Sequence, residues 1–548
     1  MQRVMALFAA LALLGAISPP DAVAQAGHTS EEATVTNPDD GTVISIAVMK
    51  PAHASQANRV PVILHSHGWA GSKSTATSSF TAWLDAGIGV VSIDQRGHGQ
   101  SGDQAHVQDP TRETEDIKAV IDYVASLDWV LKDTDAQGNV IDNDPVLGAI
   151  GGSYGGAYQT MTALDEIADE GRTRFNVLAP EISWFNLNES LAPQGVVRTA
   201  WVAALYGAGA QMLPDYVHEA FAWGSTTGQW PDGTVFGQPA PGVPDIASEF
   251  YTHGPVYFAD QGIQIDVPIL LRQGSSDNLF NLNQGLHIFE DALSPEARAD
   301  SYFVAYNGGH ALPNAMPLGS VGGSDACSGD FTGFTLSFFQ RVFAGADTKG
   351  LLPARYNFTT QDGSSCLRYE GLGYDAVPVE AVTGSIVVPT GAGAPQHHLV
   401  AEGPITVTGI PELSGSVTSA VVDSRAFFAL SVGATPATAT VVQNNVMPLR
   451  NTLPVIGETF DIELPGVAVE VPEGQNLYLT VSPISDIFAA HGSRVPGVMV
   501  LEDLELRLPR EAESDDSCHP KGNNGKGHEK GQGNGQKNGN GHGKCRPS

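Results

Sequence analysis

Ser153 is the residue whose surroundings most clearly suggest chemistry. It lies in the run 151–155, Gly-Gly-Ser-Tyr-Gly, which fits the pattern Gly-x-Ser-x-Gly. A serine in this pattern occupies a sharp turn from a strand into a helix, with its hydroxyl exposed and glycines that let strand and helix pack closely. The alternative is an ordinary glycine-rich turn, because the chain has 62 glycines among 548 residues. The residues around the motif must decide between these two interpretations.

A serine hydroxyl becomes a nucleophile only when a histidine takes its proton and a carboxylate orients that histidine. Downstream of such a turn the acid comes first and the histidine second, each after a strand. Asp277 follows a predicted strand at 266–272, and His310 follows a predicted strand at 301–306 and two glycines. The alternatives are a helix-capping Asp277 and a surface His310; we favour the catalytic interpretation for both.

Attack by a serine also needs hydrogen-bond donors for the oxyanion. The residue after the nucleophile supplies one backbone amide, here that of Tyr154. We expect the second from the amide of Trp69, in the loop 65–71 (His-Ser-His-Gly-Trp-Ala-Gly) that follows an early strand. Against this second assignment, loops between strands and helices commonly contain glycines for structural reasons.

The elements that must position these residues alternate between strand and helix. Short β-branched runs at 60–65, 89–93, 146–150 and 175–179 are predicted strands, and the apolar spacing over 113–130 and 154–165 predicts helices. This alternation is typical of an α/β fold with a largely parallel sheet. The strand at 146–150 runs directly into Ser153, which is the context that the motif requires.

About 85 residues between the strands at 175–179 and 266–272 are rich in aromatics and alanine. We expect a helical cap over about 181–265. Its aromatic side chains either line a substrate pocket or form the core of the cap, and we favour the core for most of them. They are Trp184, Trp201, Tyr206, Tyr216, Phe221, Trp223 and Trp230.

The ends of the chain differ from its middle in composition. Residues 1–26 have the basic start, apolar stretch and small-residue end of a secretory signal peptide, so we expect an exported protein without a membrane span. The catalytic domain is then 27–374, an all-β jelly-roll-like sandwich follows at 375–510, and 511–548 is a disordered tail rich in Gly, Asn, Lys and His. Sandwich and tail are candidates for contact with a surface or a polysaccharide.

Charge and motifs exclude several classes of partner. The formal net charge is −32, which disfavours nucleic acid and anionic membranes. We expect no cofactor and no metal, because the phosphate-loop pattern and His-Glu-x-x-His are both absent from the sequence. The four cysteines allow disulfides in an exported protein; proximity pairs Cys327 with Cys366 and Cys518 with Cys545.

Together these residues resemble an α/β-hydrolase, and more narrowly the peptidase S15 family of X-Pro dipeptidyl-peptidases and cocaine-esterase-type hydrolases. The resemblance rests on Asp40-Gly41, the turn 94–102, the serine motif, and Asp277 and His310 in that order, with the cap and the sandwich. It spans about 40–510. Many cocaine-esterase-type members have a tyrosine in the early oxyanion loop, whereas this chain has Trp69.

The resemblance implies cleavage of an ester or amide acyl bond through a Ser-His-Asp triad and an acyl-enzyme intermediate. Its members act on either peptides or esters, so a small ester and a peptide both remain candidate substrates. One alternative is an X-Pro-type dipeptidyl-peptidase, whose substrate ammonium group would need cap carboxylates such as Glu181, Glu189, Asp215 or Glu219. Another is an inactive protein that binds a surface or a polysaccharide.

Overall fold

The computed structural model describes residues 27–235, 237–319, 322–377, 384–489 and 491–511. Its largest element is a ten-stranded sheet with the order β1-β2-β4-β3-β7-β8-β11-β12-β13-β14. The strands from β4 to β13 in this order are parallel, and both edges are antiparallel. They are β1 Thr29–Thr36, β2 Val43–Lys50, β3 Val62–Ser66, β4 Gly89–Ile93, β7 Leu147–Gly152, β8 Val177–Glu181, β11 Leu270–Gly274, β12 Tyr302–Tyr306, β13 Tyr356–Thr359 and β14 Cys366–Tyr369.

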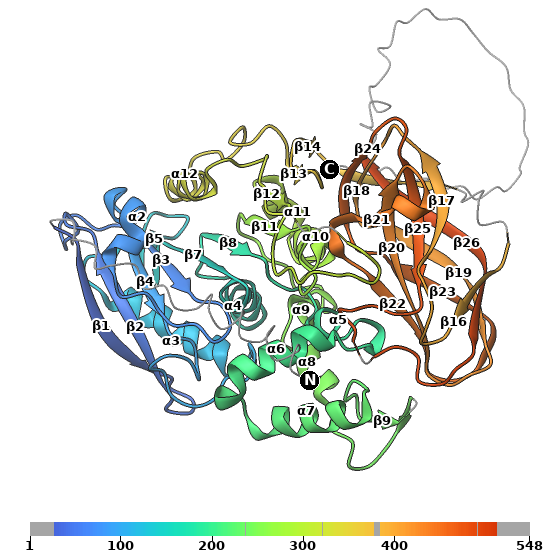
Figure 1. Ribbon diagram of the computed structural model, residues 1–548. Coiled ribbons are helices and arrows are strands. Elements are labelled where there is room, and N and C mark those ends of the chain that lie inside the picture. The colour runs from blue at the N-terminus through green and yellow to red at the C-terminus, as the bar shows by residue number, and fades with distance from the viewer. Residues whose placement is uncertain (1–26, 236, 320–321, 378–383, 490, 512–548) are drawn as a thin grey trace, which may run out of the picture. The chain divides into compact units, whose positions relative to one another are not determined.

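Helices cover both faces of this sheet (Figure 1). Because side chains alternate along a strand, Val62 and Leu64 of β3 pack into one apolar core and Ile63 into another. The first core includes α3 Glu113–Ser126, α4 Tyr154–Glu170 and α10 Leu282–Asp291, and the second includes α2 Thr81–Asp85 and α12 Phe331–Phe343. The remaining elements of this region are η1 Thr77–Phe80, α11 Pro295–Ala299 and the hairpin of β5 Lys132–Thr134 and β6 Val140–Pro145.

The insertion between β8 and β11 is helical, as expected. Its elements are α5 Leu187–Leu191, η2 Pro193–Gly195, α6 Thr199–Gly209, η3 Ala210–Met212, α7 Asp215–Thr227, β9 Thr234–Val235, β10 Gln238–Pro239, α8 Ile246–Tyr251 and α9 Pro255–Ala259. We refer to this insertion as the cap.

The C-terminal part is built from antiparallel strands around its own apolar core. One sheet has the order β15-β26-β19-β23, with β16 also on β26, and a second has the order β17-β25-β20-β21, with β22 also on β20; β18 pairs with β24. The strands are β15 Leu372–Val377, β16 Ile386–Pro389, β17 Gln396–Glu402, β18 Ile405–Gly409, β19 Glu412–Ser419, β20 Ser424–Gly433, β21 Thr440–Val441, β22 Met447–Asn451, β23 Val455–Glu463, β24 Val467–Val471, β25 Asn476–Ser482 and β26 Val498–Glu511, with η5 Pro436–Thr438 and η6 Val442–Asn444. We call this part the sandwich.

The predicted fold class, a capped α/β architecture followed by an all-β sandwich, is therefore confirmed. Several predicted boundaries were wrong. The helix predicted over 154–165 continues to Glu170, and the strands predicted at 175–179 and 266–272 lie at Val177–Glu181 and Leu270–Gly274. The helix predicted to reach Val130 ends at Ser126. Leu127 turns to extended backbone there, because Trp129 and Val130 align with Val60 and bury their side chains. The predicted signal segment, the tail, Cys518 and Cys545 lie outside the described residues.

Two further observations complete the description of the fold. Cys327 and Cys366 form a disulfide, as proximity suggested. Among the described residues, no helix has both the length and the apolarity to span a membrane.

Candidate active site

The turn at Ser153 has the geometry that its sequence predicts. Ser153 has φ 57° and ψ −122° between β7 and α4, a conformation that costs a non-glycine residue free energy. The flanking glycines make the turn possible. A Cβ on Gly151 would lie 2.7 Å from the carbonyl oxygen of Ser66, and one on Gly155 would lie 2.4 Å from the same atom. Glycine is therefore required where the turn passes over the end of β3.

The structure brings Ser153, His310 and Asp277 into one hydrogen-bonded chain. The Nε2 atom of His310 lies 3.0 Å from Ser153 Oγ, and its Nδ1 atom lies 2.7 Å from Asp277 Oδ2. A carboxylate only accepts, so Nδ1 carries the proton and Nε2 is free to accept the serine hydroxyl proton. The arrangement can therefore activate the serine as a nucleophile.

Asp277 is fully buried, and donors surround both of its carboxylate oxygens. The amides of Leu279 and Phe280 donate to Oδ1 at 3.0 and 2.7 Å, and the amide of His310 donates to Oδ2 at 2.9 Å. These bonds compensate the cost of burying a carboxylate. Gly309, at φ 107°, permits this contact, since a Cβ there would lie 2.5 Å from the Asp277 side chain.

Asn278, the residue after Asp277, joins three segments around the hydrogen-bonded chain of Ser153, His310 and Asp277. The backbone amide of Asn278 donates to the carbonyl of His310 at 2.9 Å. The side chain of Asn278 donates to the carbonyl of Leu312 and accepts from the backbone amide of Leu312. The indole of Trp201 in the cap donates to its Oδ1 at 2.8 Å, and Arg198 donates to its carbonyl at 2.9 Å. Sequence reasoning missed Asn278, although it lies within the motif that located the acid.

The sandwich also contributes to the site, through three consecutive buried amide side chains that we call the amide triplet: Gln443, Asn444 and Asn445. Gln443 donates to Ser275 Oγ at 2.8 Å, Asn444 to the Leu312 carbonyl at 2.5 Å, and Asn445 to the Asp277 carbonyl at 2.7 Å. The loops that carry Asp277 and His310 are thus both held by hydrogen bonds from the sandwich. Sequence reasoning missed these residues, and their one signal was a polar run in a segment of apolar strands.

The loop proposed to complete the oxyanion hole lies against Ser153. A Cβ on Gly68 would be 3.7 Å from the Cβ of Ser153. Among the described residues, no protein atom accepts a hydrogen bond from the backbone amide of Trp69 or of Tyr154. Both amides are therefore available to an oxyanion, and their assignment as its donors remains a proposal. The Trp69 indole instead donates to the Leu205 carbonyl of the cap at 2.9 Å.

His67 fixes the shape of this loop. Its Nδ1 atom lies 2.8 Å from the Gly68 carbonyl, so Nδ1 donates, and Nε2 accepts the Gln95 amide at 3.3 Å. Burial lowers the pKa of His67, and burial lowers the pKa of neighbouring His98 to about 4. Both imidazoles are therefore neutral at pH 7, and each acts as a structural hydrogen-bonding group.

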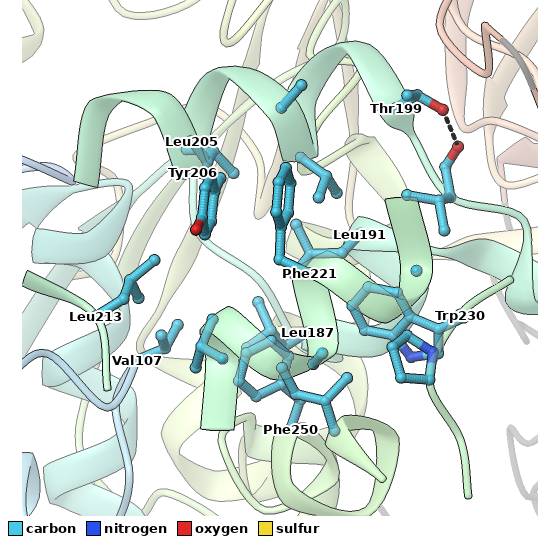
Figure 2. Close-up of a pocket in the computed structure, with 18 of the residues that line it drawn as sticks. Val107, Leu187, Leu191, Thr199, Leu205, Tyr206, Leu213, Phe221, Trp230 and Phe250 are labelled. Atoms are coloured by element: carbon cyan, nitrogen blue, oxygen red, sulfur yellow. Dashed lines mark hydrogen bonds between the residues drawn. The ribbon is translucent and has the colours of Figure 1, made fainter. Parts of the chain in front are cut away.

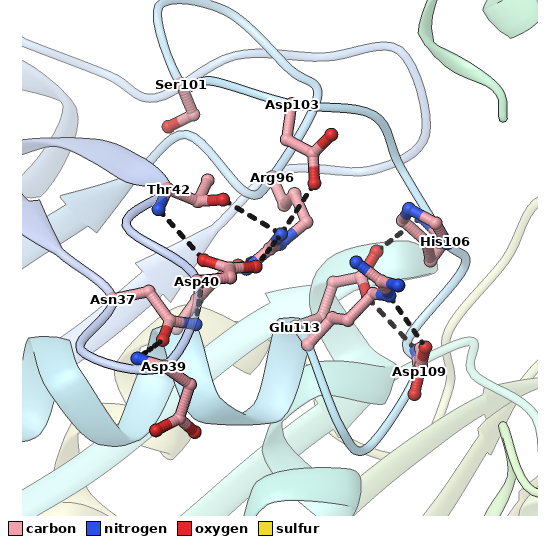
Figure 3. A network of polar contacts seen from close by, with 12 residues as sticks. Asn37, Asp39, Asp40, Thr42, Arg96, Ser101, Asp103, His106, Asp109 and Glu113 are labelled. Carbon is pink, nitrogen blue, oxygen red and sulfur yellow. Dashed lines mark hydrogen bonds and ion pairs between the residues drawn. The ribbon is translucent and has the colours of Figure 1, made fainter.

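Arg96 anchors the turn that carries Gln95 (Figure 3). Its buried guanidinium forms two bonds of 2.8 Å to Asp116 and single bonds to Asp40 at 2.6 Å and Asp103 at 2.7 Å. These bonds give the turn 94–102 a structural role. Because Gln95 contacts His67, the network extends to the proposed oxyanion loop.

Two groups of acidic and histidine residues among the described residues have the spacing of a metal site. In the group of Glu115, Asp165 and Asp169, the ammonium of Lys118 already contacts all three carboxylates at 2.6 to 2.8 Å. In the group of Asp109, Glu249 and His253, Arg112 lies 3.3 Å from Asp109. In each group a positively charged side chain, Lys118 or Arg112, already contacts one or more of the carboxylates. Neither group takes part in the proposed reaction.

Comparison with known proteins places this geometry in a family. The model of the X-Pro dipeptidyl-peptidase (S15) family matches residues 40–311, from just before β2 to the residue after His310. Over this region the chain belongs to the S15 family, and it is a hydrolase of that family. No curated protein sequence matches the chain.

Solved structures share the whole architecture. A CocE/NonD family hydrolase from Staphylococcus aureus has a TM-score of 0.60 at 12% identity, covering 91% of this chain and 100% of its own. An aminopeptidase from a marine sediment archaeon, Thaumarchaeota archaeon, gives 0.62 at 13% identity, with coverage of 90% and 99%. An α-amino acid ester hydrolase gives 0.59 at 13%, with 89% and 98%. At these identities the likeness shows a common fold.

Proposed function

We propose that this protein is a serine hydrolase in which Ser153, His310 and Asp277 form the catalytic triad. The observation that carries the proposal is the position of His310, whose two ring nitrogens lie within hydrogen-bonding distance of a serine hydroxyl and a buried carboxylate. The strained turn at Ser153 adds support, because backbone strain of this kind concentrates at functional sites.

In the acylation half, Ser153 Oγ attacks the carbonyl carbon of an ester or amide while its proton passes to His310 Nε2. The carbonyl oxygen becomes an oxyanion, which the amides of Tyr154 and Trp69 stabilise. Asp277 keeps the imidazole in the correct tautomer and stabilises its cationic form. The carbon–leaving group bond then breaks, and the leaving group takes the proton from His310.

In the deacylation half, water attacks the acyl-enzyme and gives a proton to His310 Nε2. The bond between the acyl carbon and Ser153 Oγ breaks, Oγ recovers its proton from the imidazole, and the free acid departs. The cycle consumes one water molecule, and Ser153 and His310 return to their starting protonation states. The groups that carry it out are side chains and backbone amides of this chain.

The protein is also proposed to be exported. Support comes from the predicted signal segment at 1–26 and from the disulfide between Cys327 and Cys366, because disulfides persist in oxidising compartments. Fractionating cells and determining the N-terminal sequence of the secreted protein would test this. An uncut chain retained in the cytoplasm would contradict it.

Replacing the nucleophile tests the catalytic proposal. Ser153→Ala should abolish turnover of 4-nitrophenyl acetate while leaving the thermal unfolding temperature within a few degrees of the wild type. Ser78→Ala, at an exposed site far from the triad in sequence, is the matched control and should keep full activity. Turnover by Ser153→Ala equal to that of the control would support instead the alternative of a protein without catalytic activity at this site.

A further inference from the structure

A cavity of about 190 Å³ opens beside Ser153, between the end of the sheet and the cap. Its wall comes from the loop of Trp69, from Val107, and from α5, α6, α7 and α8 of the cap. Figure 2 shows Tyr206 and Phe221 side by side on this wall; their rings stack with centroids 3.6 Å apart. An acyl group attached to Ser153 has this cavity as its neighbour.

Uncharged side chains make up the wall. Within the described residues, none of the side chains on it belongs to Asp, Glu, Lys or Arg. Burial lowers the pKa of His491, which also lines the cavity, to about 4, so this histidine is neutral at pH 7. The apolar side chains include those of Leu187, Leu191, Val202, Leu205, Leu213 and Phe250.

The aromatic residues of the cap contribute more to this wall than the sequence led us to expect. Of the seven aromatic residues that the sequence singles out in the cap, four line the cavity: Trp184, Tyr206, Phe221 and Trp230. The core role expected for most of the seven is confirmed, because five of them belong to the apolar cluster of the cap: Trp184, Trp201, Tyr206, Tyr216 and Trp230. Three of these five, Trp184, Tyr206 and Trp230, also line the cavity. Helical spacing alone does not distinguish these two environments.

The carboxylates that a peptide substrate would need lie elsewhere. Glu181 points to Arg272, with an ion pair of 3.0 Å, and Glu189 lines a different cavity beside His287. Asp215 and Glu219 are exposed to solvent. A substrate ammonium group beside Ser153 would therefore lack a counter-ion in this cavity, and burying an unpaired charge is costly.

We infer that the cavity is the acyl-binding site of the proposed serine hydrolase, and that it selects uncharged apolar acyl groups over α-aminoacyl groups and free N-termini. This inference rests on the proposed function. It makes the preferred substrate an ester or amide of an aliphatic or aryl-aliphatic acid. It also argues against the alternative of an X-Pro-type dipeptidyl-peptidase.

The volume limits the size of the acyl group. A dry apolar cavity of ~150 Å³ holds benzene, and this one measures about 190 Å³. One aromatic ring, or an aliphatic chain of similar bulk, therefore fits. We expect phenylacetyl and hexanoyl groups to be accepted, and acetyl groups to leave most of the cavity unfilled.

Two methyl esters that differ in one group provide the test. Phenylacetic acid methyl ester and phenylglycine methyl ester share ring and leaving group, and only the second carries an α-ammonium group. With the full-length enzyme at pH 7, kcat/KM for the first should exceed that for the second by on the order of 100-fold. Equal values, a preference for phenylglycine, or efficient release of an X-Pro dipeptide from its anilide would overturn the inference.

A second series separates failure of the inference from failure of the proposed function. 4-Nitrophenyl hexanoate should give a kcat/KM at least about tenfold above that of 4-nitrophenyl acetate, because added methylenes enter apolar surroundings. If both esters are turned over through Ser153 without this gain, the pocket inference fails and the hydrolase stands. If neither is turned over and a fluorophosphonate does not label Ser153, the proposed function fails.

A bulky substitution on the wall tests the position of the acyl group. Ala203→Phe on α6 fills part of the cavity and should lower kcat/KM for the hexanoate about tenfold or more while sparing the acetate. Ala208→Phe, on the exposed side of the same helix, is the matched control and should change neither. A loss of the same size for both esters in Ala203→Phe would contradict the assignment.

Discussion

The side-chain amide of Asn445, in the sandwich, donates a hydrogen bond of 2.7 Å to the backbone carbonyl of Asp277, the proposed catalytic acid. Both residues are buried, and they are 168 positions apart in the chain. Together with Gln443 and Asn444, this contact makes the sandwich part of the support for the site. A sandwich that served only as a separate binding module would need no such contact.

Asn445→Ala should therefore lower kcat without a comparable change in KM. Loss of the amide leaves the Asp277 carbonyl without this donor and relaxes the loop that orients His310, and small displacements of this kind cost up to about 100-fold in rate. The expected stability loss is about 1–3 kcal/mol, the cost of an unsatisfied buried polar group. Steady-state kinetics and chemical denaturation measure the two effects.

Asn476→Ala is the control for this variant. Its side chain bonds to the Ala434 carbonyl and to Tyr478 within the sandwich, away from the amide triplet. It should leave kcat unchanged. If Asn445→Ala also keeps wild-type kcat, the sandwich has no positioning role.

Asp277→Asn should reduce kcat by about 10³- to 10⁴-fold, since an amide cannot hold the imidazole in the tautomer that accepts the serine proton. Asn preserves the shape of the side chain, so the variant should remain folded although it replaces a buried acceptor that serves three backbone amides. Kinetics with 4-nitrophenyl acetate, beside a thermal unfolding curve, separate the two effects. A loss below tenfold in the folded variant would remove Asp277 from the triad.

Gly309→Ala should lower kcat more than Gly350→Ala, a substitution at another glycine with positive φ. Gly309 has φ 107°, and a Cβ there would lie 2.5 Å from the Asp277 side chain. Gly350 has φ 78°, and a Cβ there would meet no atom within 4 Å, so Gly350→Ala carries the backbone cost alone. We expect a kcat loss of about 100-fold for the first substitution and none for the second. Equal kcat in the two variants would contradict this explanation of Gly309.

The hydrogen bond between His287 of α10 and Glu463 of the sandwich should make the free energy of unfolding depend on pH. Hydrogen bonds and charges of Asp291 and Glu463 outweigh the desolvation of His287 and raise its pKa to about 10. Because this folded-state pKa exceeds the ordinary histidine value of 6.5, the stabilisation is complete below about pH 6.5 and is lost as the pH rises through 10. His287→Gln should cost about 2 kcal/mol at pH 6, the usual contribution of a hydrogen bond to a charged group.

Denaturation of the wild type and of His287→Gln at pH 6, 8 and 10.5 measures this dependence. The difference in free energy of unfolding should shrink steadily across the series. A difference that stays constant or grows with pH would show that the histidine is not held in its charged form.

Local signals explain which elements the sequence predicted well. Strand β4 has its predicted bounds, Gly89–Ile93, because it is a continuous β-branched run bounded by turns. The turn at Ser153 was recognisable because its glycines are needed for contacts within a few residues and with the adjacent strand. The order of Asp277 and His310 followed from the strands that precede them, and their distances agree with that order.

Contacts between distant segments explain what was missed. The amide triplet meets the catalytic loops only after two separately built regions come together, and no periodicity marks such a contact. Likewise, the aromatic composition of the cap left both a core role and a pocket role open for Tyr206, and only the assembled cap shows that it borders a cavity. Membership of a hydrolase family was therefore predictable from motifs, whereas the proposed preference for apolar acyl groups required the packed structure.

Covalent labelling of the intact enzyme is the most direct test of Ser153 as the nucleophile and of His310 as its base. A fluorophosphonate should modify the protein at one site, and mass spectrometry of the digested protein should place the adduct on Ser153; His310→Ala should slow labelling by several orders of magnitude. Adduct on another serine, or labelling of Ser153 at an unchanged rate in His310→Ala, would contradict a catalytic triad of Ser153, His310 and Asp277.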